Sequence, residues 1–338
     1  MNKQNTLVSI ISPCFNRGNL VEDMIKSILN QTYTNWELLL VDDGSDESTI
    51  KLLMGYVAID NRIHLIKRTN EEKGACSCRN IGFEASKGDY VLFLDSDDFL
   101  SPYALSQRVD FLRKKNLDFA VFGGFIYNGT IVGNVIQKRE KDIVYLLLKV
   151  EPYCLTGAAL IKRSILISHN ILWDNNIKSF QDVDFHLSLS LCGVNYDTAI
   201  DLPPDYYWRL HEQGNIGKQI NSIGHIKSHQ YLYQKIYAKI TENDELSNKY
   251  RRALRRFGGK LLLISFSGDY KMSEALLEAM KNTDKAFDIV YVSIFRWCAK
   301  NYIKHIWIVR ILLYLLYPCI FGIPPTLNFF KAIKKRFV

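Results

Sequence analysis

The first 130 residues alternate short apolar runs with segments whose apolar residues recur every three or four positions. The recurrence is clearest at Val21, Met24, Ile25 and Ile28, which fall on one face of a helix. The apolar runs have the length of strands, and they lie at residues 7–12, 36–41, 63–67, 90–94 and 118–127. Strands that alternate with helices predict the α/β class, with a doubly wound, mostly parallel sheet covered by helices.

Turn residues predict where two of these helices begin and end. Gly88 is expected to end a helix over residues 76–86, because glycine readily adopts the left-handed conformation that closes a helix. Ser101 followed by Pro102 is typical of an N-cap and a first helical position, and it predicts a helix that runs to about residue 115.

The rest of the chain divides at about Gly217. The stretch before it is mixed, with a strand expected over residues 157–162 and a helix over residues 182–191. Beyond Gly217, glycine and proline become rarer and apolar residues recur at helical spacing. We therefore expect an α/β domain over residues 1–217 and a helical C-terminal extension over residues 218–338.

Composition and charge distinguish these two parts further. The chain has 338 residues, of which 48% are hydrophobic, enough to bury a large core. Its net charge of +8 combines −5 over residues 1–217 with +13 over residues 218–338. An acidic first part disfavours nucleic acid as a partner, whereas the basic second part could face nucleic acid or an anionic membrane surface. The seven cysteines lack metal-ligand or disulfide spacing, and no secretion signal follows Met1, so a reducing cytoplasm is expected.

Polar clusters follow three of the predicted strands. They are Pro13–Arg17, Asp42–Ser45 and Asp95–Asp98. The carboxyl ends of parallel strands meet at one edge of an open sheet, where ligands of such sheets bind. Carboxylates at that edge would repel a phosphate ligand unless a hard divalent cation such as Mg²⁺ or Mn²⁺ lay between them.

Five segments together resemble a known family of enzymes. They are Val8–Asn16, Asn30–Tyr33, Glu37–Ser45, Arg79–Gly82 and Phe93–Asp98. In this order they resemble the family 2 glycosyltransferases of bacterial surface-polysaccharide type, which have the GT-A fold. The resemblance continues more thinly to about residue 215.

The resemblance implies roles for the residues that follow the strands. Pro13, Asp42 and Asp43 would line the pocket for the base and ribose of a nucleotide-sugar donor. Arg79 would lie near the donor's diphosphate. Asp95 and Asp97 match the family's Asp-x-Asp motif and would hold Mg²⁺ or Mn²⁺, with Asp97 as a direct metal ligand.

The resemblance also implies a catalytic base. The family carries a Glu-Asp pair at a helix start, and the matching residues here are Gln181 and Asp182. Asp182 is therefore the expected base, but Gln181 removes a neighbouring negative charge and so changes how the base is tuned. Asp184 is the alternative base.

Two further segments match the family near its active site. Tyr207–His211 resembles a Tyr-x-Arg-x-His segment, which implies that Arg209 contacts the donor and that His211 serves the metal or the phosphates. Thr156–Ala159 resembles an acceptor-side segment, although small residues before a strand are equally expected for packing.

The resemblance implies inverting transfer of a sugar from a nucleotide-sugar donor, UDP-linked, to a glycan or lipid-linked acceptor in surface polysaccharide synthesis. A nucleotidyltransferase is one alternative, but it would need a glycine-rich, basic loop after the first strand, which residues 13–18 do not supply. A non-catalytic protein that binds sugar nucleotides or serves as a scaffold is the other alternative, and Gln181 keeps it open.

The C-terminal extension contains a long uncharged stretch. Ile311–Phe330 holds 20 residues without a charge, and Arg310 and Lys331 flank it. Its continuous apolar piece, Ile311–Ile323, would reach about 20 Å as a helix, against a hydrocarbon core of about 30 Å. We therefore expect a peripheral contact with the inner face of the cell membrane rather than a span. Packing on the catalytic domain, or a contact in a homodimer, remains the alternative.

Overall fold

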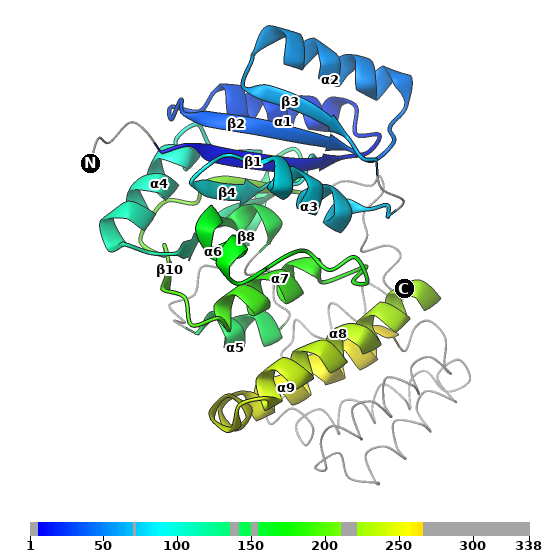
Figure 1. Ribbon diagram of the computed structural model, residues 1–338, viewed down its shortest axis with the longest axis vertical. Helices are drawn as coiled ribbons and strands as arrows, with labels where there is room; N and C mark the ends of the chain where they lie inside the picture. The colour runs from blue at the N-terminus through cyan, green and yellow to red at the C-terminus, as the bar shows by residue number, and fades with distance from the viewer. Residues whose placement is uncertain (1–5, 70–71, 136–141, 150–154, 211–221, 266–338) are drawn as a thin grey trace. The chain divides into compact units, whose positions relative to one another are not determined.

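The computed structural model describes residues 6–69, 72–135, 142–149, 155–210 and 222–265 (Figure 1). These residues form two compact units. The first contains both β-sheets, and the second contains α8 (Ile223–Thr241) and α9 (Asp244–Ser265) together with residues 148–149 and Asn176–Ser179. Gly217, where the sequence predicts a boundary, lies outside the described residues.

The larger sheet has seven strands and is mostly parallel. Its strands are β1 (Val8–Cys14), β2 (Trp36–Asp42), β3 (Ile63–Lys67), β4 (Tyr90–Phe93), β6 (Phe119–Val121), β9 (Ala159–Lys162) and β10 (Tyr196–Thr198). Their order is β10-β6-β9-β4-β1-β2-β3, and β9 runs antiparallel to both of its neighbours. The predicted α/β class with a doubly wound sheet is confirmed.

Helices cover both faces of this sheet. In chain order, the helices up to residue 190 are α1 (Asn19–Leu29), α2 (Glu47–Ile59), α3 (Ala75–Ala85), α4 (Ala104–Lys115), α5 (Ile143–Leu148), α6 (Arg163–Ser168) and α7 (Gln181–Ser190). The chain moves outward from β1 to β2 and β3 and then returns past β1 to β4. Because such crossovers are right-handed, α3 lies on the opposite face from α1 (Figure 1). At Gly82, α3 lies so close to β1 that an added Cβ would stand 2.4 Å from Ile11 Cγ2.

A second, four-stranded sheet corrects one sequence prediction. Its order is β5-β11-β7-β8, formed by β5 (Phe99–Leu100), β11 (Tyr206–Arg209), β7 (Gly124–Tyr127) and β8 (Ile131–Val135). The single strand predicted over residues 118–127 is therefore wrong, because β6 and β7 belong to different sheets. The strand predicted over residues 157–162 begins later, as a 3-10 turn over Thr156–Ala158 precedes β9.

Two predicted helix ends also differ from the structure. The helix after Pro102 begins at Ala104, with Tyr103 rather than Ser101 at the N-cap position and no side-chain capping hydrogen bond. α3 ends at Ala85 with Ser86 as its C-cap, and Gly88 is not in the left-handed region. Gly88 instead allows a close approach, since an added Cβ would stand 2.6 Å from the backbone nitrogen of Ser9.

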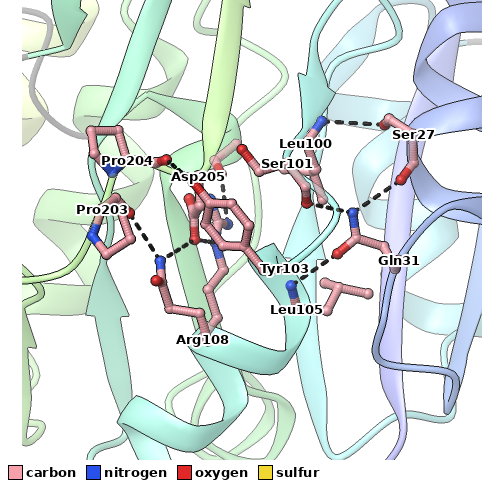
Figure 2. Close-up of polar contacts among 12 residues, drawn as sticks. Ser27, Gln31, Leu100, Ser101, Tyr103, Leu105, Arg108, Pro203, Pro204 and Asp205 are labelled. Carbon is pink, nitrogen blue, oxygen red and sulfur yellow. Dashed lines mark hydrogen bonds and ion pairs between the residues drawn. The ribbon is translucent and has the colours of Figure 1, made fainter.

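A buried polar network joins α1, β5, α4 and the segment before β11 (Figure 2). Gln31 donates to the Ser101 carbonyl and accepts from the Leu105 N–H, at 2.7 and 3.0 Å. Arg108 donates to both carboxylate oxygens of Asp205, at 2.9 and 2.6 Å, and both side chains are fully buried. The network sets the position of β5, which directly follows the Asp95–Asp98 loop, and of β11, which ends at Arg209.

The second unit is helical. α9 buries Leu254 and Phe257 and exposes Arg251 and Arg252, which is the pattern of an amphipathic helix. Within this unit, His229 of α8 shares a buried hydrogen bond of 2.7 Å with Ser179. Among the helices of the described residues, none combines the length and apolarity that crossing a membrane would require. Ile311–Phe330 lies outside those residues.

Candidate active site

Three carboxylates converge directly after β4. Asp95, Asp97 and Asp98 each offer an oxygen, and these atoms all lie within 4.8 Å of one another. The turn is closed by the Asp98 N–H, which donates to the Asp95 carbonyl at 3.0 Å. Burial raises the pKa of Asp98 well above its ordinary value, and the charges of Asp97 and Asp95 raise it further. Hard oxygen donors that crowd together in this way fit a divalent cation such as Mg²⁺ or Mn²⁺.

Arg79 ties this cluster to the start of α7. Its guanidinium donates to Asp95 at 2.5 Å and to the side-chain oxygen of Gln181 at 3.0 Å. The same guanidinium lies 4.3 Å from the centre of the Trp173 ring. Arg79 is buried, so its charge acts in a medium of low dielectric constant, where a cation interacts strongly with phosphate groups.

The Arg79–Gly82 motif supplies the support for this arginine. Asn80 donates to the Trp173 carbonyl at 2.8 Å and accepts from the Trp173 N–H at 2.9 Å, which fixes the backbone of that loop. The Trp173 ring in turn stacks on Phe185 of α7, with ring centroids 4.2 Å apart. The Arg79–Gly82 motif on α3 therefore positions both the Arg79 guanidinium and the Trp173 ring that it contacts.

Asp182 lies in the first turn of α7, next to Gln181. The pKa of Asp182 is raised to about 6, first by burial and also by the charge of Asp95, while the Val183 N–H and Arg79 oppose the rise. A carboxylate with this pKa is ionised at neutral pH yet basic enough to accept a proton. Asp182 is half-buried, whereas Asp184 is only 2% exposed, so Asp182 is the more accessible of the two candidate bases.

His186 stabilises the same turn, a contact that the sequence did not predict. Its Nδ1–H donates to the Asp182 carbonyl at 2.9 Å. Burial lowers the pKa of His186 to about 4, so the ring is neutral at physiological pH. His186 therefore holds the backbone of Asp182 without adding charge to the site.

The residues expected to contact a base and ribose gather at the ends of β1 and β2. Pro13 pairs with Val41 in the sheet, directly before Asp42. The Asp42 carboxylate accepts from the N–H groups of Gly44 and Ser45 and so shapes its own turn. Asp43 accepts from Arg68 at 2.5 Å and from the Gly74 N–H at 3.0 Å. Their role toward a nucleotide stays a prediction.

Arg209 has a different environment from Arg79. Its N–H donates to Asp98 at 2.9 Å, but its guanidinium donates to Asp23 of α1 at 2.8 Å. The backbone of Arg209 thus contacts the carboxylate cluster, while its guanidinium pairs with Asp23, and its predicted contact with the donor stays a prediction. His211 lies outside the described residues, so its predicted metal role stays a prediction.

Tyr206 lies beneath the cluster, and two glycines make room for its ring. An added Cβ would stand 2.3 Å from the ring at Gly124 and 3.2 Å at Gly157. Gly157 of the Thr156–Ala159 segment therefore has a packing role. The Tyr206 hydroxyl is buried and has no hydrogen-bond partner among the described residues.

The sequence did not single out several residues of this site. Asp98 lies within the Phe93–Asp98 motif, so its place as the third carboxylate of the cluster could have been predicted from its neighbours. Arg17, which lies 3.6 Å from Asp97, also stood in a recognised polar cluster. Trp173 and Tyr206 carried no signal, because their places depend on contacts between distant segments.

Comparisons with known proteins identify the family. A sequence model described as "Glycosyl transferase family 2" matches residues 9–169. The UDP-Glc:alpha-D-GlcNAc-diphosphoundecaprenol beta-1,3-glucosyltransferase WfgD of Escherichia coli is 32% identical over 198 residues, which are 58% of this chain and 73% of that relative. The chain belongs to glycosyl transferase family 2. The resemblance of its motifs to this family is thereby confirmed.

Other curated relatives match over different lengths. The poly(ribitol-phosphate) beta-N-acetylglucosaminyltransferase TarP of Staphylococcus aureus (strain N315) is 26% identical, and the match covers 84% of this chain and 89% of TarP. The match spans about half the length of two other curated relatives, 48% of one and 56% of the other.

Solved structures show the same fold. S. aureus TarS 1-349 in complex with UDP-GlcNAc superposes with a TM-score of 0.68 at 18% identity, over 90% of this chain and 87% of that chain. The mannosyltransferase PcManGT from Pyrobaculum calidifontis, in complex with GDP-Man and Mn2+, gives a TM-score of 0.54 at 16% identity, over 90% of this chain and 82% of that chain. The GT-A fold predicted from the motifs is confirmed.

Proposed function

We propose that this family 2 enzyme transfers a sugar from a UDP-linked donor to a hydroxyl of a glycan or lipid-linked acceptor in surface polysaccharide synthesis, with inversion at the anomeric carbon. The observation that carries the proposal is the Arg79–Asp95–Gln181 contact, with Asp182 adjacent to it and two further carboxylates next to Asp95. UDP is favoured because TarS binds UDP-GlcNAc and the name of WfgD includes UDP-Glc.

The donor would bind at the edge formed by β1, β2 and β4. Pro13, Asp42 and Asp43 would line the base and ribose pocket, and Arg79 would contact the diphosphate. A divalent cation held by Asp95, Asp97 and Asp98 would supply positive charge against the same diphosphate. Mg²⁺ and Mn²⁺ both prefer such oxygen ligands.

Asp182 would act on the acceptor. Its carboxylate takes the proton of the acceptor hydroxyl while that oxygen attacks the anomeric carbon of the donor sugar. The bond between that carbon and the diphosphate breaks, and the nucleoside diphosphate leaves from the opposite side. General-base assistance of this kind contributes about 10² to 10⁴ in rate.

The experiment measures donor turnover and transfer separately. The full-length protein is supplied with UDP-, GDP-, dTDP- and CMP-sugars together with Mg²⁺ or Mn²⁺. Asp182→Asn should keep donor binding and lower transfer, and Asp184→Asn should be milder. A larger loss in Asp184→Asn would reassign the base, and turnover of no donor would favour a non-catalytic protein.

A further inference from the structure

A cavity lies beside the carboxylate cluster, between α1 and the small sheet. Its volume is about 380 Å³, which is near the lower end for small-molecule sites and suits a ligand of one or two rings. The residues that line it include Asp23, Ser27, Asn30, Phe99, Tyr127 and Arg209. The cavity does not include Arg79, Asp95, Gln181 or Asp182, so it is separate from the proposed donor site.

One wall of the cavity is aromatic. Phe99 stacks on Tyr207 with ring centroids 4.4 Å apart, and its ring contacts that of Tyr127 edge-on at 5.2 Å. These contacts hold the rings in place before any ligand arrives. A fixed aromatic wall with polar groups nearby is suited to a sugar ring, which has C–H faces and hydroxyl edges.

The polar groups of the cavity are close to neutral in total, and the Arg209 guanidinium lies over the aromatic wall, 5.0 Å from the centre of the Phe99 ring. Arg209 pairs with Asp23 at 2.8 Å, and Lys26 pairs with Glu22 at 2.8 Å. Because both cations already have carboxylate partners, an uncharged ligand is favoured over an anion. The Asp23 side chain is 54% exposed, so its ion pair with Arg209 contributes little to stability, and hydrogen bonds to sugar hydroxyls can replace it. Asp23 would then accept hydrogen bonds, and Arg209 would donate them.

The cavity is linked directly to the carboxylate cluster. Phe99 follows Asp98 in the chain, and the Arg209 N–H donates to the Asp98 carboxylate at 2.9 Å. A sugar in the cavity would therefore lie close to the reaction centre without occupying it. We propose that this cavity binds a neutral sugar unit of the acceptor, next to the unit that is glycosylated. This inference rests on the proposed function, which supplies the acceptor.

Saturation-transfer NMR on the full-length protein tests the cavity without any donor. The probes are methyl β-glucoside, methyl N-acetyl-β-glucosaminide and ribitol. Asn30→Trp would fill the cavity from the exposed end of α1, and its matched control is Asn61→Trp, an exposed asparagine outside the cavity. We expect the wild-type protein and Asn61→Trp to bind at least one probe, and Asn30→Trp to weaken that binding at least tenfold.

Tyr127→Ala is the second variant, and thermal unfolding checks that both cavity variants are folded. We expect Tyr127→Ala also to weaken binding of the probes, because this substitution removes part of the aromatic wall. Equal binding by the wild-type protein and both cavity variants would overturn the proposal. The absence of saturation transfer with the wild-type protein would also overturn it at a probe concentration of about 50 mM, which exceeds the millimolar Kd of weak ligands. Donor hydrolysis by the wild-type protein is measured in parallel, and its absence would count against the proposed function alone.

Discussion

Gln181 determines the charge around the proposed base. Its neutral amide accepts from Arg79, whose guanidinium also donates to Asp95. The three groups together therefore carry no net charge when Asp95 is ionised. A glutamate, which the family motif has at this position, would add a negative charge beside Asp182 and disfavour ionisation of that carboxylate.

Gln181→Glu should therefore shift the pH dependence of transfer. The pKa of Asp182 is raised to about 6, so the wild-type rate should fall on acidification through about pH 6, where the carboxylate becomes protonated. The added charge raises the pKa of Asp182 further, and the acidic limb should move to higher pH. The measurement is kcat/KM against pH. Gln181→Ala, which removes the hydrogen bond without adding charge, should leave the limb in place.

Asp97→Ala should remove most metal-dependent turnover. We expect a loss of about three decades, or about 4 kcal/mol of transition-state stabilisation. Titration with Mg²⁺ and Mn²⁺ measures both the rate and the metal concentration required. Near-normal activity in this variant would refute the metal assignment of Asp97.

The segments around β5 and β11 depend on one fully buried ion pair. Arg108 of α4 holds Asp205, the residue before β11, and also donates to the Gly157 carbonyl at 2.8 Å. Breaking a buried pair leaves an uncompensated charge, so this pair is a point where single substitutions are costly.

Arg108→Met should lower the free energy of unfolding by about 3–5 kcal/mol. Burial already raises the pKa of Asp205, so the folded state holds the proton of the Asp205 carboxyl group more tightly than the unfolded chain does. A carboxyl group whose pKa is raised in the folded state destabilises that state as pH rises above the pKa of the unfolded chain. The loss in free energy of unfolding of Arg108→Met should therefore be larger at pH 8 than at pH 5. Urea unfolding at both pH values measures it.

The matched control is the surface pair of Lys115 and Asp197. Both side chains are well exposed, so Lys115→Met should change the free energy of unfolding by about 1 kcal/mol or less. A comparable loss in the two variants would show that burial of the Arg108–Asp205 pair has no special cost.

The sequence predicted the elements whose signals are local. The strand over residues 63–67 was predicted with the ends of β3, and Val21, Met24, Ile25 and Ile28 are all buried on α1. The small sheet was not predicted, since its strands come from distant segments. The break between β6 and β7 depends on Gly124, which makes room for Tyr206 more than 80 residues away in the chain.

The same distinction applies to the site. Asp95, Asp97 and Asp182 follow recognisable motifs, and the structure brings their surroundings together through Arg79. The direction of the Arg209 side chain could not be predicted, because it depends on Asp23 of α1 and on aromatic rings from β5 and β7. A motif therefore predicts which residues gather, whereas side-chain direction needs the tertiary structure.

The distribution of charge over the whole chain favours contact with a membrane surface. Residues 218–338 carry +13, and Ile311–Phe330 has no charge. In the described part of this region, Arg251 and Arg252 of α9 are exposed. Basic residues add about 1 kcal/mol each at an anionic surface and are screened by salt, whereas apolar burial is not. Such contact would bring the proposed active site to lipid-linked acceptors.

The full-length protein should therefore float with anionic vesicles at low salt, and less completely at high salt. Replacing Lys331, Lys334, Lys335 and Arg336 by glutamate should reduce flotation, because it removes four favourable charges beside the apolar stretch. The matched control replaces four exposed lysines of the first unit, Lys51, Lys67, Lys87 and Lys114, by glutamate and makes the same change in net charge. If both variants lose flotation equally, net charge alone attracts the protein. If the unmodified protein does not float, the extension serves packing or a homodimer contact instead, and lipid-linked acceptors must reach the enzyme without its help.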